Sequence, residues 1–398
     1  MNLLILSTYP IEQLMHGGQH RLANIVQAYR DAGFQVQLAG VASSPVYTAS
    51  ENFVAFPGSD KLQFDIDKSY LVDECLLGEL FAENPDYFAQ LEAKIQPIPD
   101  LIHVEQPWLF AFAKKFASLH PSKNISVLYG SQNIEHTMKF ESAKSLLSST
   151  DAQRVRDKVL ACELLAVMQA DAICCVSQED QKWLTAQRGS TCILAPNGVR
   201  PRQETEAGIK AANEISQGKK FALYCGSAHP PNIKGFFDMF GQGMGCLAPD
   251  ERLIIAGSAG IDIQNDARFL RAPNVRDQCI IANLVSEECL QGLLCTAHLI
   301  ILPITDGGGT NLKTAEALWA GKHIVATQTA MRGFEQFSSA QGLTVANSPR
   351  EFLRAIQVRM AQMPNRISDD EQQSRASVLW SHTLRDLTSA ATTLAQKA

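Results

Sequence analysis

The chain has 398 residues, 45% of them hydrophobic and 19% charged, with a formal net charge of -6 at pH 7. This composition is typical of a globular protein and excludes disordered, collagen-like and coiled-coil chains. At about 150 residues per domain, the length predicts roughly two to three domains. No run of basic residues is longer than a pair, so the positive surface that binds nucleic acids is missing, and we expect no nucleic-acid partner.

The cysteines and the first residues predict where the protein works. None of the ten cysteines forms a C-x-x-C pair, and most lie in apolar runs, which is typical of buried thiols in a reducing compartment. The opening MNLLILSTYP has no basic leader, and its apolar run is too short for a signal peptide. No run of about 18 apolar residues occurs that would span a membrane. We therefore expect a cytoplasmic protein.

Short runs rich in Val, Ile and Leu alternate along the chain with longer segments of helical period. This alternation is the pattern of βαβ units on a parallel sheet, so we predict an α/β fold with two doubly wound halves. The strands predicted in the first half are residues 3–7, 36–39, 101–105, 126–129 and 172–176. Those predicted in the second half are residues 221–225, 252–256, 279–281, 299–302, 323–326 and 343–345.

A polar stretch separates the two halves. The turn signal Pro196-Asn197-Gly198 leads into the charged residues 200–220, which have the composition of an interdomain connection. We predict one domain at residues 1–199 and a second at 200–371. Residues 372–398 have helical period, and we expect them to form a helix that returns to the first domain.

The most informative segment is LPITDGGGTNLKTAEALWAG at residues 302–321. A buried strand ends at its start, three glycines form a loop, Thr310 is suited to cap the next helix, and Gly321 is suited to end it. Strand, glycine loop and helix together make a phosphate site, because a helix N-terminus presents unpaired N–H groups and about half a positive charge. The residues expected at this site are Gly307, Gly308, Gly309, Thr310, Asn311, Lys313 and Glu316.

Two side chains of that segment specify its chemistry. Lys313 in the first helical turn adds a full positive charge to the phosphate site. Glu316, almost one turn later on the same face, is able to accept hydrogen bonds from hydroxyl groups. The segment thus predicts a diphosphate cradle beside a hydroxyl clamp. The alternative is a tight surface turn with a solvated Lys–Glu pair.

Two other glycine segments also follow predicted strands. The first is GSAHPPNIKG at residues 226–235. Here Gly226 and Ser227 allow close approach of a ligand to the backbone, and Lys234 is able to reach an anionic group. The alternative is a proline-stiffened loop with an exposed lysine. In the second, Gly17 and Gly18 lead from the first strand into a helix, which suits contact with a phosphate or a sugar; a plain turn is the alternative.

Taken together, these motifs resemble those of a GT-B glycosyltransferase. The likeness is to the large retaining group that uses nucleotide-sugar donors, and it spans nearly the whole chain. It rests on Gly17-Gly18, ADAICCVSQED (170–180), APNGV (195–199), GSAHPPNIKG (226–235) and GGGTNLKTAEALWAGKHIVAT (307–327), of which the last is specific and the others are supportive.

The resemblance implies two Rossmann-like domains that face each other across a cleft. In that family the C-terminal domain holds most of the donor, the N-terminal domain holds most of the acceptor, and no metal or separate cofactor takes part. Lys313 and Lys234 would neutralise the donor diphosphate, and Gly17 and Gly18 would lie near the reacting centre.

One position departs from the family pattern. Glu316 matches the second glutamate of the family's Glu-x7-Glu signature, which holds the donor ribose, but Gly308 stands where the first glutamate is expected. Some relatives carry a G-G-G-T-x-L-K form of the motif, and this chain resembles that branch. Asp306 is the nearest acid able to take over contacts with the transferred sugar.

In the N-terminal half, polar residues follow two predicted strands. Glu105, His103 and His136 are candidates for acceptor contact or proton transfer, with a hydrogen-bonded structural role as the alternative. Relatives often carry a histidine in this region, and Gln132 stands at that place in the segment QNIE. Residues 108–116, with Lys114-Lys115, would contact a membrane surface if the acceptor is lipid-linked; a buried helix face is the alternative.

We therefore predict an enzyme that transfers a sugar from a nucleotide-diphosphate sugar to a hydroxyl on a glycan, a lipid-linked sugar or a protein. We expect the enzyme in the cytoplasm. If its acceptor is lipid-linked, we expect peripheral contact with the inner face of the membrane. Two alternatives remain at this point. One is a GT-B sugar-nucleotide epimerase or hydrolase, and the other is a non-catalytic GT-B scaffold, which the missing glutamate at Gly308 favours.

Overall fold

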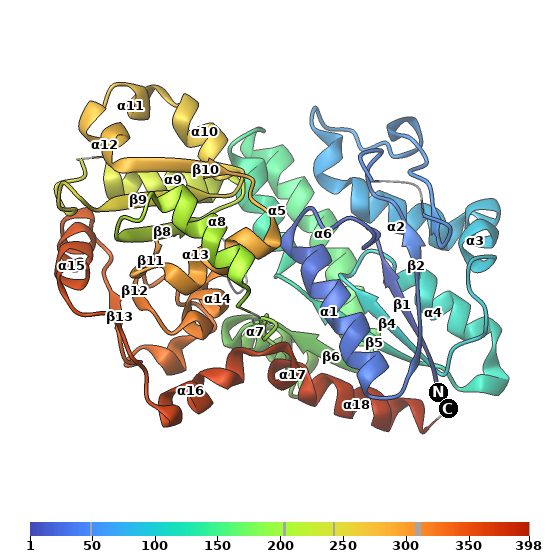
Figure 1. The fold of residues 1–398 in the computed structure, drawn as a ribbon. Coiled ribbons are helices and arrows are strands. Elements are labelled where there is room, and N and C mark those ends of the chain that lie inside the picture. The colour runs from blue at the N-terminus through green and yellow to red at the C-terminus, as the bar shows by residue number, and fades with distance from the viewer. Residues whose placement is uncertain (48–49, 202–203, 242, 307–311, 398) are drawn as a thin grey trace. The chain divides into compact units, whose positions relative to one another are not determined.

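The computed structural model describes residues 1–47, 50–201, 204–241, 243–306 and 312–397. The chain divides into two compact units: unit 1 contains Met1–Pro196 and Thr383–Ala398, and unit 2 contains Asn197–His382. Each unit is built on a parallel sheet with helices around it (Figure 1). The predicted α/β class with two doubly wound halves is confirmed.

The sheet of unit 1 has seven strands in the described residues, in the order β3-β2-β1-β4-β5-β6-β7. All neighbours pair in parallel, and β1 sits between β2 and β4. The central strands β4 and β5 are buried along their whole length, because helices cover both faces of the sheet. The strands are β1 (Asn2–Ser7), β2 (Gln35–Val41), β3 (Phe53–Val54), β4 (Leu101–Glu105), β5 (Ser126–Ser131), β6 (Ala172–Cys175) and β7 (Ile193–Leu194).

Some helices of unit 1, such as α6 and α7, begin where a short polar side chain accepts a hydrogen bond from a free N–H group of the first turn. Ser148 and Ser177 cap the helices that follow them in this way. The helices are α1 (Gly17–Asp31), α2 (Asp73–Glu83), α3 (Pro85–Glu92), α4 (Phe110–Leu119), α5 (Glu135–Lys144), α6 (Ser149–Gln169), α7 (Gln178–Arg188) and α18 (Arg385–Ala395).

Where unit 2 is described, its sheet has six strands in the order β10-β9-β8-β11-β12-β13. Alternate residues of a strand contribute to hydrophobic cores on opposite faces of the sheet, because successive side chains of a strand point to opposite faces. In β8, Phe221 and Leu223 join the core on one face, and Ala222 and Tyr224 join the core on the other. The strands are β8 (Phe221–Cys225), β9 (Arg252–Ala256), β10 (Cys279–Asn283), β11 (Leu299–Leu302), β12 (His323–Ala326) and β13 (Leu343–Val345).

The helices of unit 2 surround this sheet (Figure 1). Thr205, Ser286 and Ser348 cap three of them, the last with a full capping box. The helices are α8 (Glu206–Ser216), α9 (Pro230–Phe240), α10 (Ala259–Asn265), α11 (Ala267–Leu270), α12 (Pro273–Gln278), α13 (Glu287–Thr296), α14 (Leu312–Ala320), α15 (Pro349–Ala361) and α16 (Asp369–Arg375), followed by α17 (Trp380–Thr383) at the boundary between the units.

The structure differs from the sequence prediction in two short strands and in the last helix. The strands β3 and β7 were missed because each has two residues, too few for a periodic pattern. The predicted final helix is broken into α16, a 3-10 turn, α17 and α18, because the backbone near Leu379 pairs with Val199 in place of continuing the helix. Only the last piece, α18, packs on the strands β4, β5 and β7 of unit 1.

The order of the strands shows where each unit is able to bind a ligand. In unit 1 the order reverses at β1 and β4, and in unit 2 it reverses at β8 and β11. In open parallel sheets, ligands bind beyond the carboxyl ends of the strands at such a switch point. The loops that follow β1, β4, β8 and β11 carry most of the residues singled out from the sequence. Among the described residues, no helix is both long and apolar enough to cross a membrane.

Candidate functional site

Lys313 and Asn232 join the two loops at the switch point of unit 2. The Lys313 ammonium donates a hydrogen bond of 2.8 Å to Asn232 Oδ1. Lys313 lies in the first turn of α14, after β11, and Asn232 lies in the first turn of α9, after β8. A full positive charge is therefore held between two helix N-termini, which themselves favour anions.

Asn232 is itself fixed, so it holds Lys313 in a defined place. Its amide nitrogen donates to Ser227 O at 2.9 Å and to Ser227 Oγ at 3.1 Å. The buried Tyr224 hydroxyl donates to Asn232 O at 2.8 Å. The role of Asn232 was not predicted, although it stands within the GSAHPPNIKG motif, because neither spacing nor composition indicates which side chain an asparagine will contact.

Burial sets the electrostatics around Lys313. It lowers the pKa of Lys313 below its ordinary value, while the charge of Glu316 acts in the opposite direction. Burial, and then the nearby Lys313 charge, lower the pKa of His229, so His229 is neutral at pH 7. An anion placed here would stabilise the ammonium form of Lys313, because opposite charges at close range favour ionisation.

Lys234 is placed differently from Lys313. Its ammonium forms an ion pair of 2.6 Å with Asp238 one turn later, and its side chain is 58% exposed. Asp238 also accepts a hydrogen bond of 2.8 Å from the Thr305 hydroxyl, in the loop after β11. Lys234 thus lies near that loop but is already paired with a carboxylate.

Glycines allow the backbone of unit 2 to pack closely under this site. A Cβ on Gly235 would lie 2.0 Å from Pro303 O, and one on Gly226 would lie 3.0 Å from the Tyr224 hydroxyl oxygen. Any larger residue at 235 would push α9 away from the end of β11. The loop residues Gly307, Gly308, Gly309, Thr310 and Asn311, which the sequence places at the donor phosphate, lie outside the described residues.

The C-terminal end of α14 is clamped by a second set of contacts that the sequence did not indicate. The fully buried Arg375 donates to Leu318 O at 3.0 Å and to Gln341 O, and it pairs with Glu371 at 2.8 Å. Asn365 donates to Gly321 O at 3.0 Å. The bonds to Leu318 O and Gly321 O anchor the C-terminal end of the helix that carries Lys313 and Glu316.

A second polar group lies at the switch point of unit 1, around Glu105 at the end of β4. Its carboxylate accepts from His103 Nε2 at 2.8 Å and from Gln132 Nε2 at 2.8 Å, and it pairs with Arg21 at 3.3 Å. The Tyr29 hydroxyl lies 2.7 Å from His103 Nδ1. His103 and Glu105 were expected from the sequence, whereas Arg21 and Tyr29 were not.

These contacts keep Glu105 ionised. Burial by itself would raise the pKa of Glu105, but the His103 hydrogen bond and the Arg21 charge outweigh it and lower the pKa below its ordinary value. Gly130 on β5 makes room for the pair, since a Cβ there would lie 2.4 Å from both Glu105 Oε2 and His103 Nε2. The geometry is that of a buried carboxylate which orients its neighbours.

Gln132 connects this group to the start of α1. Its Nε2 donates to the Tyr9 hydroxyl at 2.6 Å as well as to Glu105. A Cβ on Gly18 would lie 2.9 Å from that Tyr9 hydroxyl oxygen, so the absence of a side chain lets α1 begin against Tyr9. Gly17 is exposed beside it. The structure thus brings Gly18, Gln132 and Glu105 together.

His136 lies in a different environment. Its Nδ1 donates to the buried Glu163 at 2.6 Å, and its ring lies 5.1 Å from that of Trp183. Glu163 also accepts from the backbone N–H of Glu135, so it fixes the start of α5. These contacts agree with the structural alternative for His136.

The proposed membrane-contact segment proves to be core. Trp108, Phe110, Phe112 and Phe116 are each at most 1% exposed. Lys115 donates to Ala82 O at 2.7 Å. The interpretation of residues 108–116 as a membrane surface is therefore wrong, because the apolar face of α4 packs against the sheet.

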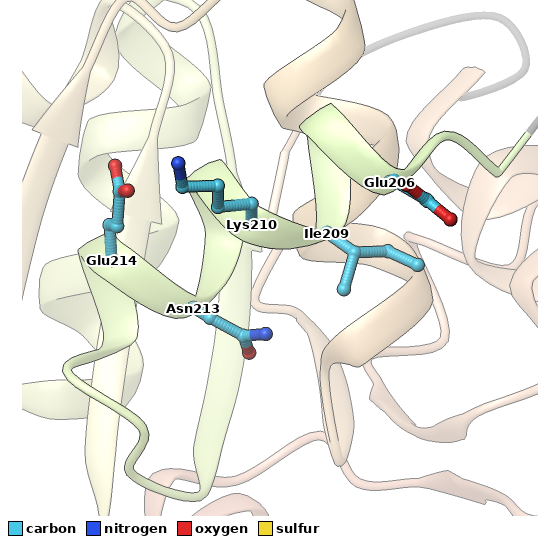
Figure 2. Close-up of a pocket in the computed structure, with 5 residues that line it drawn as sticks. All are labelled: Glu206, Ile209, Lys210, Asn213 and Glu214. Carbon is cyan, nitrogen blue, oxygen red and sulfur yellow. The ribbon is translucent and has the colours of Figure 1, made fainter.

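Two surface hollows lie away from these groups. One, of about 450 Å³, is a shallow depression lined by Glu206, Ile209, Lys210, Asn213 and Glu214, all from α8 (Figure 2). Alternating charges four residues apart on one exposed helix are typical of a solvated face. The other, of about 590 Å³, is lined mainly by β1, β2 and residues near Pro97. Within the described parts of the chain, no three His, Cys, Asp or Glu side chains are grouped to hold a metal.

Comparison with protein-family models finds a match within the second unit. A model of the family Glycosyl transferases group 1 matches residues 219–361, which include Asn232, Lys313 and Glu316. The predicted resemblance to glycosyltransferases is confirmed for this part of the chain. Comparison with curated protein sequences finds no match.

Solved structures match along the whole chain. Sucrose-phosphate synthase from Thermosynechococcus elongatus has 16% identity and a TM-score of 0.61, with 100% of this chain and 96% of that chain covered. WaaG, a glycosyltransferase involved in lipopolysaccharide biosynthesis, has 13% identity and a TM-score of 0.60, with 100% and 99% covered. Anabaena HepE in complex with UDP and glucose has 13% identity and a TM-score of 0.59, with 100% and 98% covered. At these identities the matches show the GT-B fold, and with the family match they support sugar transfer from a nucleotide sugar.

Proposed function

We propose that this protein is a glycosyltransferase that passes a sugar from a nucleotide-diphosphate sugar to a hydroxyl acceptor, with retained anomeric configuration and without a bound metal or separate cofactor. The observation that carries the proposal is the half-buried ammonium of Lys313, held by Asn232 between the first turns of α9 and α14. The family match covers the same residues.

The proposed chemistry follows from the charge that develops on the leaving diphosphate. When the bond to the sugar breaks, negative charge builds up on the bridging oxygen, and fixed donors stabilise that state more than the bound donor. Lys313 supplies the positive charge. Glu316 accepts hydrogen bonds from the donor ribose, and Asp306 contacts the transferred sugar.

The donor is a nucleotide sugar, and UDP-glucose is the first to test because HepE structures contain UDP and UDP-glucose. The acceptor is a glycan, a lipid-linked sugar or a protein, bound at the switch point of unit 1 near Gly18, Gln132 and Glu105. Peripheral contact with the inner membrane face would accompany a lipid-linked acceptor, but residues 108–116 do not supply the surface for it.

The test compares Lys313→Ala with Lys234→Ala in donor turnover, with EDTA present. We expect Lys313→Ala to lower kcat/KM by about 100-fold to 1,000-fold, as for removal of one charge-stabilising donor. Lys234→Ala should lose less activity than Lys313→Ala, because the Lys234 ammonium is 58% exposed and already paired with Asp238. Turnover of Lys313→Ala within a few-fold of wild type would refute the assignment.

Two further arms of this test separate the alternatives. Conversion of the donor with no acceptor present would indicate an epimerase or hydrolase. An absence of measurable UDP binding by calorimetry would indicate a non-catalytic scaffold. Proton NMR of the first product formed, before mutarotation, reports whether the anomeric configuration is retained.

A further inference from the structure

The first turn of α9 has almost no backbone N–H group to offer a ligand. The four N–H groups that a helix leaves without an intrahelical partner at its start belong here to residues 229–232. Pro230 and Pro231 have no N–H, and the N–H of Asn232 bonds to His229 O at 2.9 Å. Of these four positions, only His229 keeps a backbone N–H that no other described residue accepts.

This start differs from the helix ends that bind phosphates. Such ends hold an anion through several backbone N–H groups in a row, helped by the helix dipole. α9 keeps the dipole but lacks most of the N–H groups. A diphosphate that lies against this end of α9 therefore needs side chains as hydrogen-bond donors, and Lys313 on α14 is one of them.

The side chain of His229 is placed to be a second donor. His229 is the N-cap residue of α9, with an extended backbone, and it is exposed to solvent. Its ring makes no capping bond and no hydrogen bond to another described residue. A neutral imidazole has one ring N–H to donate. A ligand in solution is thus able to reach a donor that the described part of the protein does not use.

His229 and Lys313 are close enough to influence each other's charge. Partial burial, and then the Lys313 charge, hold the pKa of His229 below its ordinary value, so the ring is neutral at pH 7 without a ligand. Among the described residues, Lys313 is the one charged group that shifts the pKa of His229. Glu316 on α14 and the Cys225 thiol at the end of β8 act on Lys313. An anion beside both side chains would favour their protonated forms.

We propose that His229 is a donor-binding residue, whose ring N–H hydrogen-bonds the diphosphate of the nucleotide sugar beside Lys313. The side chain replaces the backbone N–H groups that Pro230 and Pro231 remove from the start of α9. The inference rests on the proposed glycosyl transfer, and it gives His229 a role that the motif resemblance does not.

The contact makes donor affinity depend on pH near neutrality. In the complex the charge of the diphosphate opposes burial and the Lys313 charge, so the pKa of His229 rises toward its ordinary value. The complex then takes up a proton that the free protein does not hold. Donor affinity should therefore rise as the pH falls from 7.5 to 5.5, and the rise should depend on His229.

The experiment titrates UDP-glucose, ADP-glucose and GDP-glucose into the full chain by calorimetry without acceptor, and continues with the one that binds most tightly. Both phosphates of these donors are esterified, so the ligand takes up no proton in this range. The variants are His229→Ala, His229→Gln and Lys313→Arg, with His120→Gln at the end of α4 as the control. Affinity is measured from pH 5.5 to pH 7.5, and urea unfolding at pH 7.

We expect His229→Ala to bind the donor at least about 10-fold more weakly at pH 7, as for loss of a hydrogen bond to a charged group. His229→Gln should lose less affinity, because its amide still donates, but it should show no rise toward pH 5.5. Lys313→Arg and His120→Gln should keep the rise. The unfolding midpoint of both His229 variants should match that of wild type, because the side chain is exposed.

Three results would overturn the inference. These are an unchanged donor affinity in His229→Ala, a wild-type affinity that stays flat between pH 5.5 and pH 7.5, or a rise that persists in His229→Gln and disappears in Lys313→Arg. The last would mean that the lysine is the titrating group.

The proposed function fails in a different way. If a donor binds through His229 and no acceptor-dependent transfer follows, the inference stands and the transfer function is wrong. If none of the three donors binds, both are wrong.

Discussion

Lys313 donates a hydrogen bond of 2.8 Å to Asn232, which lies 81 residues earlier in the chain. The bond ties the first turn of α14 to the first turn of α9, at the point where the strand order of the second sheet reverses. The half-buried Lys313 ammonium is thus oriented by an amide that Ser227 and Tyr224 hold in place. This contact therefore sets the position of the Lys313 ammonium at the proposed nucleotide-sugar site.

The lowered pKa of Lys313 predicts how donor binding depends on pH. Only the ammonium form attracts a diphosphate, so affinity should fall as pH rises through that pKa, earlier than for an exposed lysine with a pKa of about 10.4. Lys313→Arg stays charged throughout and should show a flat profile. Calorimetric titration of UDP from pH 7 to pH 10 measures the affinity of the wild type and of Lys313→Arg. A wild-type profile as flat as that of the arginine variant would contradict the prediction.

Arg375 should affect donor binding from the far end of α14. Arg375→Gln removes the donors to Leu318 O and Gln341 O and leaves Glu371 without its buried partner. We expect a loss of about 3 to 5 kcal/mol in the free energy of unfolding. We also expect a donor KM raised several-fold, with a smaller change in kcat.

Urea unfolding and initial rates check the two parts of that prediction, with the exposed Arg354→Gln on α15 as control. A stability loss with an unchanged donor KM would mean that Arg375 supports the fold without positioning α14.

Gly130 should not tolerate a methyl group. In Gly130→Ala the new Cβ would lie 2.4 Å from two buried polar atoms, Glu105 Oε2 and His103 Nε2, so their hydrogen bond must be distorted. Overpacking of this kind costs about 1 to 3 kcal/mol. Gly245→Ala is the control, because nothing lies within 4 Å of a Cβ at that glycine. Equal urea midpoints for the two variants would show that the predicted crowding is absent.

Glu135 should make stability fall as pH rises. Its pKa is raised from 4.5 to about 8 in the folded protein, so the folded state holds a proton that the unfolded state releases over this range. The stabilisation is complete below about pH 4.5 and is lost as pH approaches 8. The free energy of unfolding falls by at most about 5 kcal/mol over this range. Glu135→Gln cannot ionise and should flatten this part of the profile. Urea unfolding of the wild type and of Glu135→Gln between pH 5 and pH 9 measures this difference. If the free energy of unfolding changed with pH in the same way in both proteins, the raised pKa of Glu135 would be excluded.

The sequence alone determined the elements and the kind of chemistry at the second sheet. Runs such as 299–302 and 323–326 predict buried parallel strands because burial on both faces demands apolar side chains throughout, a requirement that is visible locally. The order of strand, glycines, lysine and glutamate predicts an anion site for the same reason, since a helix end and its first turn are neighbours in the chain.

Tertiary structure alone decided which distant side chains meet. The partners Lys313 and Asn232, Glu105 and Arg21, and Arg375 and Leu318 are each more than 50 residues apart, and no periodic pattern links their positions. Whether a lysine is solvated like Lys234 or half-buried like Lys313 depends on how helices pack against the sheet. Burial and charge at close range then set the pKa values, so these properties arise only when the chain has folded.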